Sequence, residues 1–189
     1  TGAVSPKAAL IFAFALEIAA FLLFSIWVNL LSAFLTVGAC AFYVFIYTVW
    51  LKRRTSQNIV IGGAAGAFPP MVGWAAVTGE IALGSIILFT IIFMWTPPHF
   101  WSLSLYRRGD YERAGVPMLP VVAGDAETRR QILIYTAVLA PLGTAPPLIG
   151  MASLYFGVIA AVLGLVYIFL AVAICKYDGE VYPRRAFTY

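Results

Sequence analysis

The sequence predicts an all-α protein, a bundle of six transmembrane helices. Its composition is 62% hydrophobic and 11% charged, whereas about a quarter of the residues in an ordinary soluble domain are charged. The chain also contains six apolar runs, each close to the roughly 20 residues that a helix needs to cross a hydrocarbon core. These runs cover residues 8–27, 30–51, 59–77, 81–101, 132–150 and 154–174.

The basic residues lie on one side of this predicted bundle. All twelve Lys and Arg residues precede the first run, separate the second from the third or the fourth from the fifth, or follow the sixth. Basic segments stay on the cytoplasmic or matrix side of a membrane. We therefore expect a multi-pass protein of the bacterial inner (plasma) membrane or the mitochondrial inner membrane, with these segments facing cytoplasm or matrix. The same bias accounts for the net charge of +4, so we expect no nucleic-acid partner.

Both ends of the chain are expected to be loops. Residues 1–7 are predicted to form a loop in which Ser5 caps the first helix and Pro6 opens it. Residues 182–189 are predicted to form a second loop after the last run. Cys40 and Cys175 have no CxxC motif or histidine cluster near them, which predicts free thiols that serve packing.

Three of the predicted helices contain a Pro-Pro pair, at residues 69–70, 97–98 and 146–147. Each pair removes backbone donors and bends its helix. Carbonyl groups freed at membrane depth need protein or a wet cavity to satisfy them. One pair alone is explained by a simple kink, but three in adjacent helices favour a cavity. The small residues 62–67 predict close approach of a neighbouring helix.

The longest polar segment, residues 105–131, mixes arginines with carboxylates. Long loops are usually functional or disordered, and the Tyr, Val, Met and Pro content here argues against disorder. Carboxylates at this position suit Mg²⁺ together with phosphate oxygens, and arginine binds phosphate through paired hydrogen bonds. A solvated loop would show the same mixture of charges. Within this segment, Asp125, Glu127 and Thr128 predict the capped start of the fifth helix.

Polar residues also gather around the end of the second run. Lys52 and Arg53 end this run, and Thr48 lies four residues before Lys52, on the same face of an α-helix. Tyr47 extends a polar edge deeper into the membrane. The alternative is an interfacial anchor, where Tyr and basic residues commonly gather. Asn58 is placed to cap the third helix.

Two single ionisable residues lie within the apolar runs. His99, the one histidine, follows Pro97 and Pro98 at the basic end of its helix. An imidazole can ligate iron, although such a residue can equally serve as an interfacial hydrogen-bonding group. Glu17 lies near the middle of the first run, where a carboxylate is costly and often functional. A protonated or hydrogen-bonded carboxyl within the bundle is the alternative.

Taken in order, these segments resemble a known family. They are residues 47–58 (YTVWLKRRTSQN), 62–74 (GGAAGAFPPMVGW), 95–101 (WTPPHFW) and 110–120 (DYERAGVPMLP). The chain resembles the UbiA-type intramembrane prenyltransferases and, within them, the protoheme IX farnesyltransferases (haem O synthases). The resemblance spans essentially the whole chain.

The resemblance implies transfer of the farnesyl group of farnesyl diphosphate to a vinyl group of haem b, with Mg²⁺ as cofactor. Mg²⁺ stabilises the charge that develops on the departing diphosphate, and Asp110 is the implied metal ligand. The implied catalytic residues are Asp110, Lys52 and Arg53. Residues implied to bind substrate are Tyr47, Thr48, Asn58, His99, Trp101, Arg107 and Tyr111. Of these, the rings of Tyr47 and Trp101 would shield an allylic cation.

The chain departs from the family pattern in two respects. The family has about nine helices and a further acidic motif, N-x-x-x-D-x-x-x-D, whereas no Asp precedes Asp110 here. We therefore expect residues 1–189 to be part of a single transmembrane prenyltransferase domain, without that motif and the last helix, and inactive alone. The lipid bilayer surrounds it, and oxidase-assembly proteins are candidate partners.

Three other functions remain open at this point. A UbiA-type enzyme could act on an aromatic acceptor instead of haem. A secondary transporter also uses broken helices and intramembrane acids, although no internal repeat is visible here. A non-catalytic assembly subunit would leave Asp110 replaceable.

Overall fold

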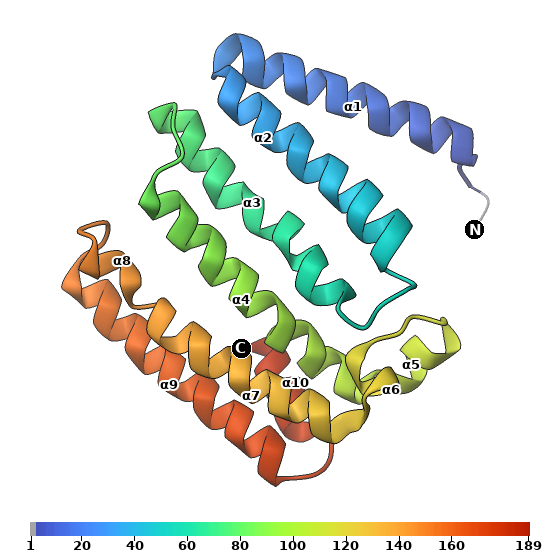
Figure 1. The fold of residues 1–189 in the computed structure, drawn as a ribbon, viewed down its shortest axis with the longest axis vertical. Helices are drawn as coiled ribbons and strands as arrows, with labels where there is room; N and C mark the ends of the chain where they lie inside the picture. Colours follow the sequence, from blue (N-terminus) through green and yellow to red (C-terminus); the bar gives the residue numbers. More distant parts are fainter. Residues whose placement is uncertain (1–2) are drawn as a thin grey trace.

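The computed structural model describes residues 3–189, and six of its helical segments are long and apolar enough to cross a membrane (Figure 1). The spans are α1 (Pro6–Trp27), α2 (Leu30–Ala41) continued by η1 (Phe42–Leu51), α3 (Asn58–Thr78), α4 (Leu83–Tyr106), α7 (Gly124–Leu142) followed by α8 (Ala145–Leu148), and α9 (Leu154–Lys176). Three shorter helices are α5 (Arg108–Arg113), α6 (Leu119–Val122) and α10 (Val181–Thr188). The described residues contain no strand, so the predicted all-α membrane class is confirmed.

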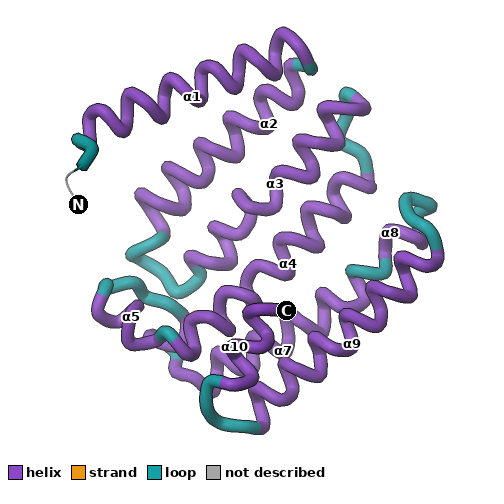
Figure 2. The backbone as a smooth tube through the Cα atoms, turned by 180° about the vertical axis from the view of Figure 1, so that it is seen from behind, coloured by secondary structure: helices purple, strands orange, loops and turns teal. Residues whose placement is uncertain are grey.

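The spans pack in chain order. Helix α1 contacts α2, α2 contacts α3, α3 contacts α4, α4 contacts α7, and α7 contacts α9. Figure 1 shows this succession of antiparallel helices, with α5 and α6 beyond the ends of the spans. Seen from behind in Figure 2, the turn between η1 and α3 lies at the same end as α5. The alternation therefore brings the basic segments together at one end of the bundle, which we call the basic end.

At the opposite end, α2 is fixed to α3 by one side chain. The Asn29 side chain caps α2 by accepting from the Ser32 N–H at 2.9 Å. Its amide also donates to the carbonyl of Ala75 in α3 at 2.8 Å. The same residue thus satisfies a free N–H at the start of α2 and ties α2 to the end of α3, where the Ala75 carbonyl also accepts from the Gly79 N–H.

The structure confirms the predicted helix cap near the N-terminus but contradicts the loop predicted at the C-terminus. Ser5 caps α1 as expected, accepting from the Ala8 N–H at 3.2 Å; residues 1–2 of the predicted loop lie outside the described part. The predicted C-terminal loop is wrong, because these residues form α10. Pro183 is compatible with the first turn of a helix, Ala186 is buried against the core, and Arg184 pairs with Glu180 at 2.5 Å.

The fifth span begins at Gly124, before its apolar run and beside the Asp125, Glu127 and Thr128 residues that predicted its start. Carboxylates in its first turn complement the helix dipole. The expected side-chain cap is absent from this described turn. Asp125 instead accepts from Arg108 at 3.1 Å, and the Thr128 hydroxyl donates to the Gly124 carbonyl at 2.8 Å. The predicted position of the start is therefore confirmed, but the side-chain cap was wrong, since arginine on α5 competes for the carboxylate.

The Pro-Pro pairs have two different settings. The pairs at 69–70 and 97–98 lie inside α3 and α4, as expected. The third pair does not lie within the long helix, because α7 ends at Leu142 and the pair falls in the short helix α8. Proline fits there because the first turn of a helix needs no backbone donor.

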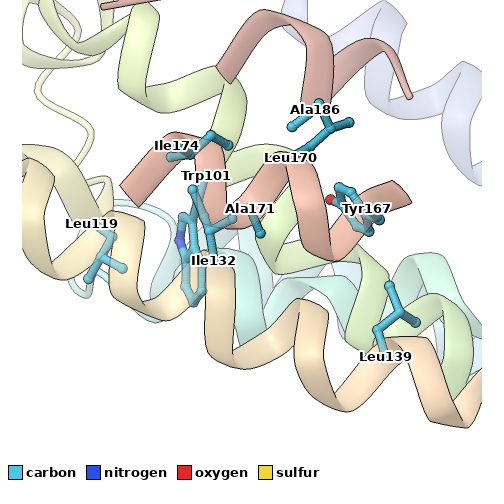
Figure 3. Packing of buried hydrophobic residues seen from close by; sticks show 9 residues of the cluster. All are labelled: Trp101, Leu119, Ile132, Leu139, Tyr167, Leu170, Ala171, Ile174 and Ala186. Atoms are coloured by element: carbon cyan, nitrogen blue, oxygen red, sulfur yellow. The ribbon is translucent and has the colours of Figure 1, made fainter. Parts of the chain in front are cut away.

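The hydrophobic core lies between α4, α6, α7, α9 and α10 (Figure 3). Trp101 is at its centre, 1% exposed, with its ring edge-on to Tyr135 at a centroid distance of 5.3 Å. The cluster consists of Trp101, Leu119, Ile132, Leu139, Tyr167, Leu170, Ala171, Ile174 and Ala186. In contrast, α1 has no buried residue. The later helices therefore form the firmest part of the described chain.

We expect Trp101→Ala to lower the free energy of unfolding by about 3–5 kcal/mol, because it leaves a cavity in this core. Thermal unfolding in detergent micelles would measure the loss. Trp50→Ala is the matched control, since the Trp50 side chain is 53% exposed and should shift stability much less. Equal losses in the two variants would contradict the assignment of Trp101 to the core.

Candidate active site

Two adjoining cavities connect the basic end with the interior of the bundle. The first, which we call the apolar cavity, has a volume of about 660 Å³ and lies among α2, η1, α3 and α4. The second, the polar mouth, has a volume of about 430 Å³ and is closed by residues of α5 and the following turn. Tyr47, Ile59 and Phe100 line both cavities. A ligand with a polar head and an apolar tail could therefore occupy both.

The two cavities have different linings. The apolar cavity is lined by Ala39, Cys40, Tyr43, Tyr47, Ile59, Gly62, Gly63, Ala65, Gly66, Ile92, Trp95, Thr96 and Phe100. The polar mouth is lined by Tyr47, Lys52, Ile59, Phe100, Asp110, Tyr111, Ala114, Val116 and Met118. Lys52 and Asp110, which carry opposite charges, thus line the polar mouth but not the apolar cavity.

Two glycines of α3 allow its neighbours to approach closely. A Cβ atom at Gly62 would collide with the ring of Tyr47, and one at Gly63 would lie 3.0 Å from the Thr96 methyl carbon. Close backbone approach at small residues is the usual mode of helix packing in membranes. The predicted close approach at residues 62–67 is therefore confirmed for these two positions.

The segment η1 is a π-helix, and this changes which residue lies beside Lys52. The Lys52 N–H donates to the Tyr47 carbonyl, five residues earlier, at 2.8 Å. The Lys52 ammonium lies 5.9 Å from the centre of the Tyr47 ring, within reach of a cation–π interaction. Thr48 is exposed, lines neither cavity, and donates to the Tyr43 carbonyl at 2.9 Å. The expected pairing of Thr48 with Lys52 assumed α-helical spacing and was wrong.

Asn58 fixes the turn that joins η1 to α3. It is 1% exposed, and its amide donates to the Lys52 carbonyl at 3.1 Å. It is the first residue of α3, whereas Gln57 occupies the capping position. Asn58 therefore holds the backbone of Lys52 instead of capping the helix.

Asp110 and Tyr111 form the α5 side of the mouth. The half-exposed Asp110 carboxylate accepts from Arg107 at 3.3 Å and from Arg113. Ion pairs at such exposure contribute little to stability, so the carboxylate can exchange these partners for a ligand. Burial raises the pKa of the Tyr111 phenol, with smaller effects from Tyr106 and Asp110. Tyr111 therefore stays a neutral hydrogen-bond donor at physiological pH.

Besides Thr48 and Asn58, four predicted site residues line neither cavity: Arg53, Arg107, Trp101 and His99. Arg53 is exposed in the turn after η1 and lines neither cavity. Trp101 belongs to the hydrophobic core and lines neither cavity. The adjacent Phe100, which sequence reasoning missed, lines both cavities. Its position inside the Pro-Pro-His-Phe-Trp stretch was the signal that could have identified Phe100.

His99 lies between two aromatic rings. Its imidazole stacks on Trp95 of α4 and on Phe187 of α10, at centroid distances of 4.1 and 4.4 Å. It lines neither cavity, although Trp95 lines the apolar one. Its Nδ1 atom is buried without a hydrogen-bond partner among the described residues.

The intramembrane carboxyl of Glu17 lies outside the site. It lines a separate hollow of about 220 Å³, which lies between α1 on one side and the continuous span of α2 and η1 on the other. Cys40 lines both this hollow and the apolar cavity, and is a free thiol, as is Cys175. Glu17 therefore has no access to the polar mouth in this arrangement.

Within residues 3–189, no three or more His, Cys, Asp or Glu side chains come together as a metal-binding group. Asp110 is the single carboxylate that lines the mouth. This fits a hard cation such as Mg²⁺, which often takes one or two protein carboxylates and completes its shell with phosphate oxygens and water.

Comparison with known proteins gives one consistent result. The model of the UbiA prenyltransferase family matches residues 1–189. The chain is 55% identical over 171 residues to protoheme IX farnesyltransferase 2 of Mesorhizobium japonicum, covering 90% of this chain and 54% of that protein. It is 55% identical over 186 residues to protoheme IX farnesyltransferase of Azorhizobium caulinodans, covering 97% and 58%. For the protein of that name from Parvibaculum lavamentivorans, the identity is 54% over 176 residues, covering 93% and 55%.

The chain thus spans about half the length of the curated relatives it matches. No solved structure matches it. Neither the family nor these relatives favour the transporter alternative.

Gly62→Ala should destabilise the protein by about 1–3 kcal/mol, because the added methyl overlaps the Tyr47 ring near its attachment to the chain. Gly73→Ala is the control on the same helix, since a Cβ there meets no atom within 4 Å. The control should be neutral or gain up to about 1 kcal/mol from better helix propensity. Thermal unfolding in detergent distinguishes these signs, and a stable Gly62→Ala protein would contradict the close contact.

Proposed function

The chain belongs to the UbiA prenyltransferase family, and from this premise we propose that its protein transfers the farnesyl group of farnesyl diphosphate to haem b. The carbon–oxygen bond of the donor breaks and diphosphate leaves. A carbon–carbon bond forms to a vinyl group of haem b, and water adds to the other vinyl carbon, giving haem O. The names of the most similar relatives support this choice of donor and acceptor.

The continuity of the polar mouth with the apolar cavity carries the proposal. Farnesyl diphosphate is itself divided into an anionic head and a long hydrocarbon chain. The mouth offers Lys52, Tyr111 and Asp110 to the head, while the apolar cavity offers space for the chain. Tyr47 and Phe100 would then lie where head and chain join, beside the bond that breaks.

Each residue of the mouth has a distinct proposed task. Lys52 binds the diphosphate, with its backbone held by the buried Asn58. Tyr111 donates a hydrogen bond to a phosphate oxygen. Arg53 and Arg107, both exposed at the basic end, attract the anion from solution and add charge–charge stabilisation.

Asp110 is the proposed metal ligand, directly or through water. Mg²⁺ bound to the diphosphate would neutralise charge on the leaving group. Asp110 would give up its exposed pairs with Arg107 and Arg113, and these arginines then become free to contact phosphate oxygens.

Tyr47 and Phe100, whose rings lie where the two cavities meet, have a separate proposed task. Loss of diphosphate leaves an allylic cation, which ring faces stabilise. The rings of Tyr47 and Phe100 can provide this, and the apolar lining excludes water that would otherwise capture the cation. We propose these two residues for the role first assigned to Tyr47 and Trp101.

For the acceptor, we propose that His99 helps to orient haem b by holding the Trp95 ring, on which its imidazole stacks. Trp95 lines the apolar cavity, so haem bound near Trp95 would be positioned by this ring. We further propose that the basic end faces the cytoplasm or matrix, because the diphosphate donor arrives from water.

The natural full-length protein, given farnesyl diphosphate, haem b and Mg²⁺, should form hydroxyfarnesylated haem that mass spectrometry detects. Asp110→Asn should lower the rate by about 100-fold without removing the protein from the membrane. Asp125→Asn is the matched control, since Asp125 pairs with Arg108 at the same end but does not line the mouth. Full activity of Asp110→Asn would exclude its role at the metal.

A second comparison separates the two adjacent cations. Lys52→Gln should raise the KM for farnesyl diphosphate about tenfold or more, since a lost hydrogen bond to a charged group costs about 1.5–3 kcal/mol. Arg53→Gln should raise it less, because Arg53 lies outside the mouth. Steady-state kinetics at several ionic strengths would show the Arg53 effect disappear with salt. The reverse order of effects would contradict the assignment of Lys52 to the diphosphate.

A further inference from the structure

The deep part of the apolar cavity is lined by small residues of α2 and α3 and by Ile92 of α4. At the basic end the cavity begins with Tyr47, Ile59 and Phe100, which are shared with the mouth. Farther along the same three walls, it is lined by residues 39–40 of α2, Gly66 of α3 and residue 92 of α4. Among the described residues of α3, none beyond Gly66 lines it. Gly66 therefore marks the deep end of the cavity on this helix.

Gly66 differs from the two glycines nearer the mouth. A Cβ at Gly62 or Gly63 would press on Tyr47 or Thr96, whereas a Cβ at Gly66 would meet no atom within 4 Å. Gly62 and Gly63 are thus needed for helix packing, whereas Gly66 is exposed and borders open space where it lines the cavity. The absence of a side chain at Gly66 keeps that space open.

The position of Gly66 also matches the scale of a prenyl chain. It lies four residues beyond Gly62, about 6 Å along an α-helix, which is close to the length of one isoprene unit. The diphosphate is held at the mouth, so each additional unit must extend toward the deep end. A side chain at Gly66 would occupy the space of the last unit without disturbing the mouth.

We propose that Gly66 determines the longest prenyl chain that the donor site accepts. The inference rests on the proposed function, because it assigns the apolar cavity to the donor chain. Leucine at this position shortens the cavity by filling its deep end, so that a geranyl chain still fits and a farnesyl chain does not. On the opposite wall, Ala39 and Cys40 are also small and leave the space beside Gly66 open, whereas Ile92 of α4 is the one large side chain at this depth.

The test measures binding and turnover separately. Binding uses the non-hydrolysable thiolodiphosphates of geraniol, farnesol and geranylgeraniol, titrated by calorimetry into the natural full-length protein with Mg²⁺. The wild type should bind the farnesyl analogue more tightly than the geranyl analogue. Gly66→Leu should lower the farnesyl-to-geranyl affinity ratio by about tenfold or more, the scale of steric discrimination in an apolar pocket.

Two further variants control for helix damage. Gly73→Leu makes the same change on the same helix, where a side chain also meets no atom within 4 Å but does not line the cavity. It should leave the affinity ratio unchanged. Gly66→Ala adds a single methyl and should lower the farnesyl-to-geranyl affinity ratio by less than Gly66→Leu does. If the leucine variant does not fold, the alanine variant tests the role of Gly66.

The outcomes separate the inference from the proposed function. Equal weakening of all three analogues, or an unchanged ratio in both Gly66 variants, overturns the role of Gly66. Haem farnesylation by the wild type with an unshifted ratio overturns this inference alone. Chain-length-dependent binding that shifts with Gly66, but no prenyl transfer to haem by the wild type, supports the inference and overturns the choice of acceptor.

Discussion

Helix α3 turns a face without side chains toward both of its neighbours, and the site depends on that contact. Tyr47 lies over Gly62 and Thr96 over Gly63, which brings η1 and α4 against the α3 backbone. Lipid gives helices no hydrophobic reason to associate, so close dispersion contacts must hold them together. Larger residues at these two positions would separate the walls of the apolar cavity. One turn deeper, the same lack of side chains leaves space, because no neighbour fills the place beside Gly66.

The basic end combines a firm support with exchangeable charges. Asn58 is buried and bonded to the Lys52 carbonyl, so its loss would leave polar groups unpaired in an apolar setting. By contrast, the arginine pairs of Asp110 are exposed and worth about 0–1 kcal/mol each. A site that must capture and release an anion benefits from this difference. The support keeps its geometry while the charged side chains change partners.

The sequence predicted the helices well where hydropathy alone decides them. The first two spans begin or end within two residues of prediction, since a bilayer requires internally bonded helices of fixed length. Predictions failed where polar residues join helices: the start of α7 has no side-chain cap, and α10 replaces a loop. Both depend on ion pairs or core contacts that become visible only in three dimensions.

The site was predicted in part. Lys52, Asp110, Tyr47 and Tyr111 come together at one mouth, although they belong to three separate motifs. The other expected residues line neither cavity: Arg53, Arg107, Thr48, Asn58, His99 and Trp101. The placement of Thr48 assumed 3.6 residues per turn, whereas η1 is wound as a π-helix. Trp101 is held in the hydrophobic core by contacts with other helices, which the sequence does not reveal.

The π-helix has a consequence for how this region tolerates change in length. Each residue of an α-helix advances about 100° around the axis, and π-helical turns hold one extra residue per hydrogen-bonded ring. Deleting a single residue between Phe42 and Leu51 could therefore be absorbed by rewinding to α-helix, with the backbone still fully bonded. The span would survive in the membrane, but Tyr47 and Lys52 would no longer face the same cavity. In a family alignment, the number of residues in this stretch would carry as much information about the site as their identities.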